Sequence, residues 1–257
     1  MSEAAVDTVV AALLRARAQQ RGLGGAELAS ALGDAQQAYA VQARVADALQ
    51  WFDNGAAPRH WKSGGPSRQA TLTHAPLPPA GVWTSPATAG AWPFNMRGIE
   101  AEVALRLGAS VDAATAASID EARAAALVDA LTVSIEIVDS RWSEGMAAPA
   151  LLRLADLQSH GALVLGDWVP WAPRDWARQT CRVWIGAQPI VERQGTHALG
   201  SPLWGLGAWL RHATQGGQVV AAGSVVTTGT WVGVLDAAAG DRVRVEFPGI
   251  GVAQVQL

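Results

Sequence analysis

The sequence predicts an α+β fold in which a small helical region precedes a β-rich region. Apolar residues recur at helical spacing over residues 3–20 and again over about 33–50. From residue 98 onward, many short runs are β-branched or alternate between apolar and polar residues, as is typical of strands. No linker-like stretch separates the two parts, so we expect an N-terminal helical region at 1–60 and a β-rich domain at 61–257.

Composition excludes several classes of function. Half of the 257 residues are hydrophobic, which is enough for a full core. The net charge is −3 without a basic stripe, so nucleic acid is not an expected partner. Cys181 is the only cysteine, which excludes an internal disulfide and suits the reducing cytoplasm. The chain opens without a signal-peptide pattern and has no apolar run near the ~20 residues of a membrane span, so we expect a cytoplasmic protein that does not enter a membrane.

Two amphipathic helices are predicted in the N-terminal region. The first is followed by Gly22 and Gly24, which end it. Its apolar face consists of Val6, Val9, Val10, Leu13 and Leu14. The inward face of the second consists of Ala38, Val41, Val45, Ala48 and Leu49.

The most informative pattern is the strand predicted over residues 98–107. Glu100 and Glu102 are two residues apart, so their side chains point to the same face of the strand. A second apolar run, 132–139, carries the lone carboxylate Glu136 among β-branched neighbours. Buried carboxylates require a cation, and oxygen ligands suit a hard divalent one. The alternative is an exposed strand edge, where paired carboxylates are simply solvated.

The remaining elements follow from periodicity and turn residues. Residues 71–97 are rich in Pro, Gly, Ala and Trp and are expected to be irregular. A helix is predicted over 112–130 and a loop or short turn over 146–155. Further on we expect a hairpin around Gly186–Ala187, a helix from 203 to about 214, and strands over 223–228, 231–235, 242–247 and 252–257.

Two segments resemble the hydratase and decarboxylase branch of the fumarylacetoacetate hydrolase superfamily, whose best known members are the 2-keto-4-pentenoate hydratases. Gly98–Leu107 is similar to its "E-A-E-I-A-F" strand, and Ser134–Arg141 to its "A-I-E-I-V-D-S-R" segment. Weaker similarity runs from about residue 33 to the C-terminus, including Ala38–Gln42 ("A-Y-A-V-Q"). The resemblance implies a mixed β-roll or barrel-like catalytic domain with a small N-terminal helical region.

The resemblance also implies a metal site. In this family, Glu100, Glu102 and Glu136 would bind Mg²⁺ or Mn²⁺, and the metal would hold a small 2-oxo acid substrate. Lys62 aligns with a lysine that enters the family's active site. From the residues alone, the alternative is a surface lysine in a Gly-rich turn. The family's Ile-Gly-Leu-Thr is replaced here by Ser-Gly-Gly-Pro, which keeps the lysine but loosens its local scaffold.

Two further segments are expected to contact the substrate. Gly195–Pro202 resembles a glycine-rich family loop, and Val225–Thr230 resembles the family's "V-V-L-T-G-S". The resemblance therefore implies that Ser201, Thr228 and Gly229 bind substrate.

One departure from the family bears on proton transfer. The family usually has an aspartate, a candidate general base, in a turn where this chain has Pro78–Gly81. No Asp or Glu occurs between Asn54 and Glu100. His160 stands at a normally small position in a segment that lines the family's site, so it is a candidate replacement. The alternative is a histidine with only a structural role.

These residues lead to four hypotheses on function. The first is a metal-dependent hydratase acting on a 2-hydroxydienoate in the meta-cleavage catabolism of aromatic compounds, with Lys62 and His160 moving protons. The second is a decarboxylase of a 2-oxo-3-enedioate, which needs no base to generate a nucleophile. The third is a C–C hydrolase of the acylpyruvate type, and the fourth is a non-catalytic partner subunit.

Assembly is predicted from the aromatic residues. Twelve Trp exceed what one core of this size is expected to hide, and surplus aromatics often lie at interfaces. We therefore expect a homo-oligomer, and the resemblance adds a complex with a related decarboxylase or hydratase.

Overall fold

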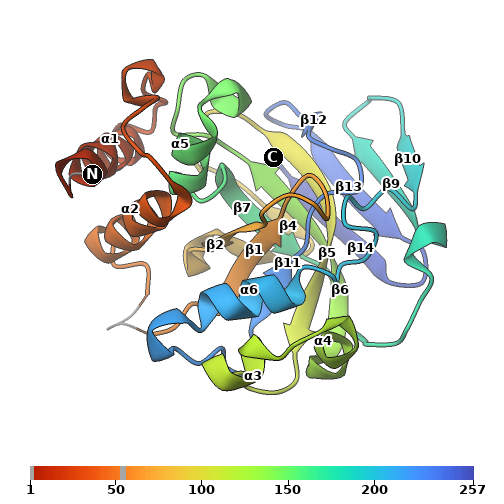
Figure 1. Ribbon diagram of the computed structural model, residues 1–257. Helices are drawn as coiled ribbons and strands as arrows, with labels where there is room; N and C mark the ends of the chain where they lie inside the picture. The colour runs from red at the N-terminus through yellow and green to blue at the C-terminus, as the bar shows by residue number, and fades with distance from the viewer. Residues whose placement is uncertain (1–2, 53–55) are drawn as a thin grey trace.

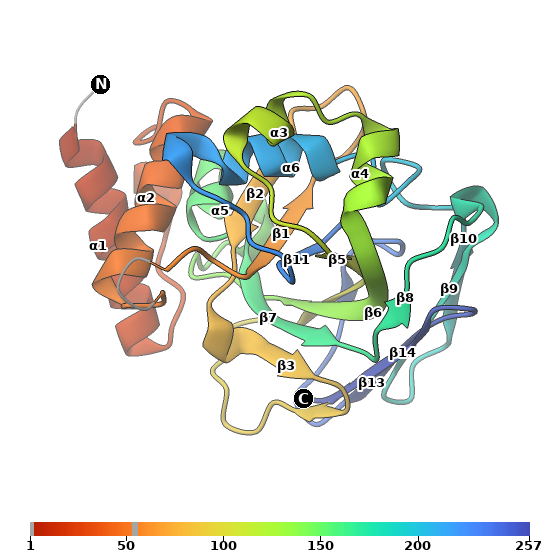
Figure 2. The same ribbon diagram turned by 90° about the horizontal axis from the view of Figure 1, so that it is seen from below.

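The computed structural model describes residues 3–52 and 56–257. Two β-sheets form the centre of the molecule (Figure 1). The N-terminal helices lie at one side, and three further helices lie together at one end (Figure 2). The predicted α+β arrangement, with a helical region before the strands, is confirmed. No helix among the described residues is both long and apolar enough to cross a bilayer.

The N-terminal helices are α1 (Glu3–Gln19) and α2 (Ala35–Ala48), with the short turn η1 (Ala26–Leu28) between them. Asp34 begins α2 by accepting a hydrogen bond from the Gln37 backbone N–H at 3.0 Å. Both helices pack with α5 (Ala150–Ala155) around a separate core that includes Val9, Leu13, Val41, Val45, Trp142 and Leu152. Ala48 and Leu49 are exposed rather than buried, because α2 ends at Ala48 and its last turn faces solvent.

The larger sheet contains nine strands in the order β2-β1-β11-β5-β6-β7-β3, with β12 added to β5 and β8 added to β6. Their bounds are β1 His60–Gly64, β2 Thr73–Pro76, β3 Val82–Thr84, β5 Gly98–Leu107, β6 Val128–Val138, β7 His160–Leu165, β8 Val169–Pro170, β11 Val225–Thr227 and β12 Leu235–Asp236. The predicted strands at 98–107 and 132–139 therefore form the long central pair β5 and β6.

The smaller sheet has five strands in the order β10-β9-β13-β14-β4. Their bounds are β4 Ala87–Thr88, β9 Thr180–Ile185, β10 Val191–Gln194, β13 Arg242–Phe247 and β14 Gly251–Gln256. β13 and β14 pack against β6, so the inner faces of the two sheets share one hydrophobic core. Cys181 is buried within it.

The helices at the end of the sheets are α3 (Ala113–Ala117), α4 (Glu121–Leu127) and α6 (Leu206–Ala213) (Figure 2). The predicted helix 112–130 is wrong as a single element. Asp120 begins a second helix by accepting the Arg123 N–H at 2.8 Å, and strand β6 already starts at Val128. Isolated short turns are η3 (Pro79–Gly81), η4 (Gly145–Ala147), η5 (Trp176–Arg178) and η6 (Gln215–Gly217).

Other sequence expectations also need correction. Residues 71–97 contain three short strands, which find partners at the edges of the two sheets. Residues 146–155 contain α5, which Pro149 precedes, as proline often does at a helix start. The expected strand 231–235 shrinks to β12, whereas the hairpin at Gly186–Ala187 is confirmed as β9 and β10.

Candidate metal centre and active site

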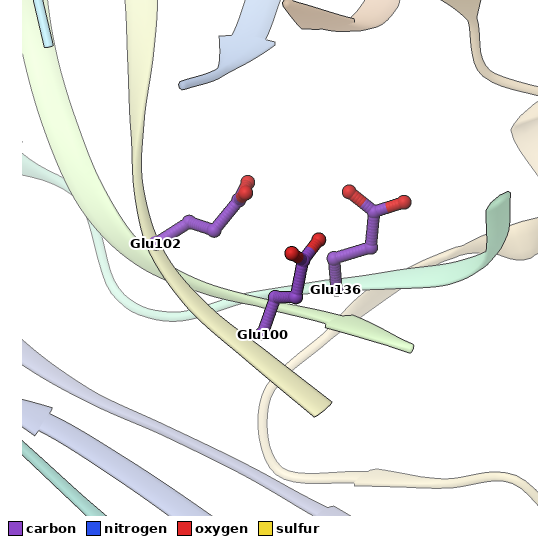
Figure 3. Close-up of side chains that lie close together, drawn as sticks. All are labelled: Glu100, Glu102 and Glu136. Carbon is purple, nitrogen blue, oxygen red and sulfur yellow. The ribbon is translucent and has the colours of Figure 1, made fainter. Parts of the chain in front are cut away.

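The three predicted metal ligands come together on one face of the β5–β6 pair. Glu100 lies directly opposite Glu136 in the antiparallel register, and Glu102 lies opposite Ser134. Figure 3 shows their three carboxyl groups turned toward one common space. One carboxylate oxygen from each residue lies within 4.8 Å of the others. The alternation predicted from the sequence therefore places these oxygens close enough to share one cation.

Burial makes this cluster costly without a cation. Glu136 is 0% exposed and Glu102 is 2% exposed. Burial and the negative charge of Glu136 raise the pKa of Glu100 to about 7, and the same causes raise the pKa of Glu102 well above its ordinary value. Burial and repulsion therefore favour the protonated forms of Glu100 and Glu102. Lys62 and His160 outweigh burial at Glu136 and lower its pKa.

Lys62 supplies one positive charge to the cluster. It lies in β1, hydrogen-bonded between β2 and β11, so its scaffold is a strand and not the loose turn expected from the sequence. Its Nζ donates to Glu136 Oε1 and, at 3.2 Å, to the carbonyl oxygen of Gln158. Burial lowers the pKa of Lys62, but the three glutamates outweigh burial and raise it. Without a metal, Lys62 is therefore held in its charged form.

The donor set fits a hard divalent cation. A cation would displace the protons that burial favours on Glu100 and Glu102. Glu136 Oε2 is buried without a hydrogen-bond partner among the described residues. The Thr227 hydroxyl donates a hydrogen bond to Glu102 Oε2. The Ser134 hydroxyl is in turn hydrogen-bonded to the Thr227 hydroxyl, with 2.8 Å between the two oxygens. Such outer hydrogen bonds orient the ligands of a metal. Glu100, Glu102 and Glu136 would therefore bind Mg²⁺ or Mn²⁺ through oxygen.

A cavity of about 410 Å³ opens beside these carboxylates, and we call it the glutamate cavity. Its lining includes Lys62, Glu100 and Glu102. Thr228 and Gly229, which were predicted to bind substrate, also line it. Ser201 is not among its lining residues, and its hydroxyl accepts the Leu203 N–H at 3.2 Å.

His197 is a lining residue that sequence reasoning missed, although it lies in the glycine-rich segment. The Leu199 N–H donates to His197 Nδ1 at 3.2 Å, so Nε2 carries the proton and donates to the Thr228 carbonyl oxygen. Burial lowers the pKa of His197 to about 4. His197 is therefore a neutral brace for the loop at Thr228, with both ring nitrogens already engaged.

His160 lies beside Glu136 but does not line the glutamate cavity. Its Nδ1 is 3.1 Å from Glu136 Oε1, and the ring is buried outside the lining of the glutamate cavity. Burial lowers the pKa of His160 despite the contact with Glu136. Its direct neighbour is thus a metal-ligand candidate and not the substrate space, and its predicted role in proton transfer stays a prediction.

Arg153 is the second missed residue. It lines the glutamate cavity and donates only its Nε, at 3.1 Å, to the Ala148 carbonyl oxygen among the described residues. Its terminal nitrogens are thus available to an anion in the cavity. Pro149 followed by good helix formers could have indicated that this arginine stands on a helix.

An ion-pair network fixes the end of β6. Arg141 donates its Nε to Asp156 at 2.7 Å and an Nη to the His160 carbonyl oxygen at 2.7 Å. Arg17 of α1 reaches the same Asp156 oxygen at 3.2 Å. The N-terminal helix is thereby tied to the segment that positions Glu136 and His160.

Comparison with known proteins gives a family match. A family profile described as "Fumarylacetoacetate (FAA) hydrolase C-terminal" matches residues 51–257. No curated protein sequence matches the chain. The matched range contains all eight site residues predicted from the sequence.

Solved structures share the fold. The 4-oxalocrotonate decarboxylase from Pseudomonas putida G7, complexed with magnesium and adipate, superposes with a TM-score of 0.81 at 17% identity, covering 97% of both chains. A 2-hydroxyhepta-2,4-diene-1,7-dioate isomerase from Mycobacterium marinum gives 0.55 at 16%, covering 78% of this chain and 74% of its own. A 5-carboxymethyl-2-hydroxymuconate delta-isomerase from Mycobacterium smegmatis gives 0.54 at 18%, covering 78% and 76%. The predicted mixed β architecture with its N-terminal helical region is thus confirmed.

Proposed function

Because the chain belongs to the fumarylacetoacetate hydrolase family, we propose that it is a metal-dependent enzyme acting on a small 2-oxo acid. For the reaction itself, we propose decarboxylation of a 2-oxo-3-enedioate, as in 4-oxalocrotonate. The observation that carries this choice is the composition of the glutamate cavity. The cavity has carboxylates that can bind a cation, and it also has the cationic side chains of Lys62 and Arg153. None of its described lining residues is free to act as a base.

A bound Mg²⁺ or Mn²⁺ would supply an electrophile that stabilises negative charge on the 2-oxo oxygen. The protein's own residues do the rest. Glu100, Glu102 and Glu136 hold the cation, and Thr227 fixes the orientation of Glu102. Thr228 and Gly229 present the loop that His197 braces, against which the substrate carboxylate would lie.

Arg153 favours a substrate with two carboxylates. Arg153 lines the cavity, and its terminal nitrogens have no hydrogen-bond partner among the described residues. A guanidinium binds carboxylates well. A 2-hydroxydienoate has no second carboxylate for it. In the proposed reaction the bond to the distal carboxylate breaks, CO₂ leaves, and the electron pair enters the dienolate. Arg153 would position that carboxylate before the bond breaks.

Hydration remains the second candidate, because Lys62 lines the cavity and carries protons. For that reaction Lys62 would have to leave Glu136, and the missing acid of Pro78–Gly81 would need a substitute. The superposition with the 4-oxalocrotonate decarboxylase includes the N-terminal helices as well as the β domain, and this supports the first candidate over the second.

The two candidates are separated by product analysis. The purified protein with Mg²⁺ or Mn²⁺ is incubated with 2-oxohex-3-enedioate, with 2-hydroxypenta-2,4-dienoate and with an acylpyruvate, while ultraviolet absorbance and CO₂ are followed. We expect CO₂ from the first compound. Hydration of the second without CO₂ release would replace decarboxylation, cleavage of the third would indicate the C–C hydrolase, and no turnover would indicate a non-catalytic subunit.

We also propose a homo-oligomer in the cytoplasm, alone or in a complex with a related enzyme. Five of the twelve Trp are buried and the other seven are partly exposed, so aromatic surface is available for an interface. Sedimentation at micromolar concentration would detect the oligomer, and a purely monomeric species would contradict it.

A further inference from the structure

The linker between α1 and α2, residues 20–34, is attached to a wall of the glutamate cavity. The segment between β6 and α5 forms this wall, and its Met146 lines the cavity. The Leu23 N–H donates to the Arg141 carbonyl oxygen, and the Ser143 N–H donates to the Leu23 carbonyl oxygen, both at 2.9 Å. Figure 1 shows α5 beside the N-terminal helices. The linker therefore contacts the cavity wall, although it precedes the range that the family profile matches.

Glu144 makes the strongest part of this attachment. Its carboxylate accepts the Gly25 N–H at 2.8 Å through Oε1 and at 3.0 Å through Oε2, and its Oε1 also accepts the Ala26 N–H at 3.1 Å. Hydrogen bonds to a charged acceptor are stronger than those between neutral groups. Gly25 also packs closely, because a Cβ on it would lie 3.2 Å from Leu152 of α5 and 3.3 Å from Trp142. The linker is therefore held in one position against the wall.

Arg153 is anchored to the turn that begins at Glu144. Its Nε donates to the Ala148 carbonyl oxygen at 3.1 Å, and the Ala148 N–H donates to the Gly145 carbonyl oxygen at 3.2 Å. Gly145 directly follows Glu144, so the turn that holds the acceptor of Arg153 starts at the attached residue. Among the described residues, Ala148 provides the one hydrogen bond that orients the Arg153 guanidinium. The orientation of Arg153 in the cavity therefore depends on this turn.

We propose that Glu144 is a positioning residue for substrate specificity, which attaches this turn to the linker and so orients Arg153 toward the distal carboxylate of a dicarboxylic 2-oxo acid. The inference rests on the proposed function, from which it takes the role of Arg153. Glu144 is not among the lining residues of the glutamate cavity, so it acts on the substrate only through the turn. A loosened turn would have to be ordered again on binding, and this cost weakens the hold on the second carboxylate.

The test compares two probes that differ only at the distal end. 2-Oxohexanedioate ends in a carboxylate and 2-oxohexanoate ends in a methyl group, and each is titrated calorimetrically into the full chain with saturating Mn²⁺. Because the 2-oxo acid end is the same in both, the ratio of their dissociation constants measures the contact with Arg153. The parent should bind the diacid at least about tenfold more tightly, as expected for a hydrogen bond between charged groups. Arg153→Met should bring this ratio to about one.

Variants of the attachment separate positioning from general stability. Glu144→Ala should reduce the ratio to about threefold or less, with the affinities for Mn²⁺ and for 2-oxohexanoate within about twofold of the parent. Glu144→Gln keeps an amide oxygen for the two N–H groups that Oε1 accepts, so its ratio should stay within about twofold of the parent. Asp34→Ala is the control, because it removes the acceptor of the Gln37 N–H at the start of α2. It should lower the melting temperature and leave the ratio unchanged.

The outcomes distinguish this inference from the proposed function. A parental ratio in Glu144→Ala, with the ratio lost in Arg153→Met, would overturn the positioning role of Glu144 and leave the role of Arg153 intact. Equal affinity of the parent for the two probes would overturn both roles. A ratio that falls as far in Asp34→Ala as in Glu144→Ala would also overturn the proposal, because general loosening of the N-terminal region would then explain the effect.

Discussion

The two faces of the β5–β6 pair carry opposite chemistry on the same backbone. Ile99, Val103 and Ile135 point to one face, are fully buried and pack within the core shared with the smaller sheet. Glu100 and Glu136 alternate with them and point to the other face. The apolar face stabilises the fold through burial, whereas the carboxylates cost desolvation and repulsion. One strand pair can therefore hold a core and a metal site, and substitutions on alternate residues should separate stability from metal binding.

The largest effect is expected on the carboxylate face. Glu136→Gln should abolish measurable Mn²⁺ binding, because it removes one anionic ligand and leaves a weak amide oxygen. The metal-free variant should be less stable than the parent, because buried Lys62 loses the negative charge that it contacts. Calorimetric titration and thermal unfolding measure both effects. Equal Mn²⁺ affinity in variant and parent would remove Glu136 from the ligand set.

The matched change on the core face is Ile135→Ala. Removing most of a fully buried aliphatic side chain should cost about 2–5 kcal/mol of unfolding free energy. The folded fraction should keep Mn²⁺ affinity near that of the parent, because Ile135 points away from the carboxylates. Denaturant unfolding gives the first quantity and titration the second. A variant that is as stable as the parent but does not bind Mn²⁺ would contradict the assignment of stability to one face and metal binding to the other.

Proton competition gives a smaller, pH-dependent effect. The pKa of Glu100 is raised to about 7 by burial and by Glu136, above its ordinary value. The folded state therefore holds more protons than the unfolded state between the ordinary value of 4.5 and about 7, so the metal-free chain loses stability as the pH rises through this window. A cation must displace the same proton, so Mn²⁺ affinity should rise with pH from about 5.5 to 8, by up to about tenfold per unit.

Glu100→Gln is the control for this dependence, because it removes the titrating group. Its Mn²⁺ affinity should be lower and should vary less with pH than that of the parent. A parental affinity that does not change over this pH range would show that the carboxylates are already unprotonated without metal.

The smallest effect is expected at His160. If decarboxylation is the reaction, His160→Ala should change kcat by about threefold or less, because the ring does not face the substrate space. If hydration is the reaction and His160 moves the proton, the loss should be about 10²–10⁴-fold with metal affinity largely kept. Steady-state kinetics on the active substrate decides between the two, with Lys62→Ala measured in parallel.

The parts of the molecule that the sequence predicts well are those governed by local alternation. Glu100 and Glu102 could be assigned to one face because the strand period is two, and Glu136 because a lone acid in a β-branched run needs a partner. That Glu100 stands directly opposite Glu136 depends on register, which no local pattern specifies. The N-terminal helices were also predictable from a local pattern, the recurrence of apolar residues at helical spacing.

Other features depend on contacts between distant segments. Lys62 looked like a turn residue because Gly64, Gly65 and Pro66 follow it, but pairing with β2 and β11 makes it part of a strand. The pKa of Lys62 could not be predicted, since its sign depends on three glutamates far away in sequence. Arg153 and His197 were missed because only the folded chain brings them to the glutamate cavity.

The central claim is that Glu100, Glu102 and Glu136 share one divalent cation. Crystals of the protein grown with Mn²⁺ test it directly through anomalous scattering at the manganese edge. We predict one strong peak within coordination distance of a carboxylate oxygen from each of the three residues. A peak elsewhere, or none at a Mn²⁺ concentration that saturates binding in solution, would contradict it.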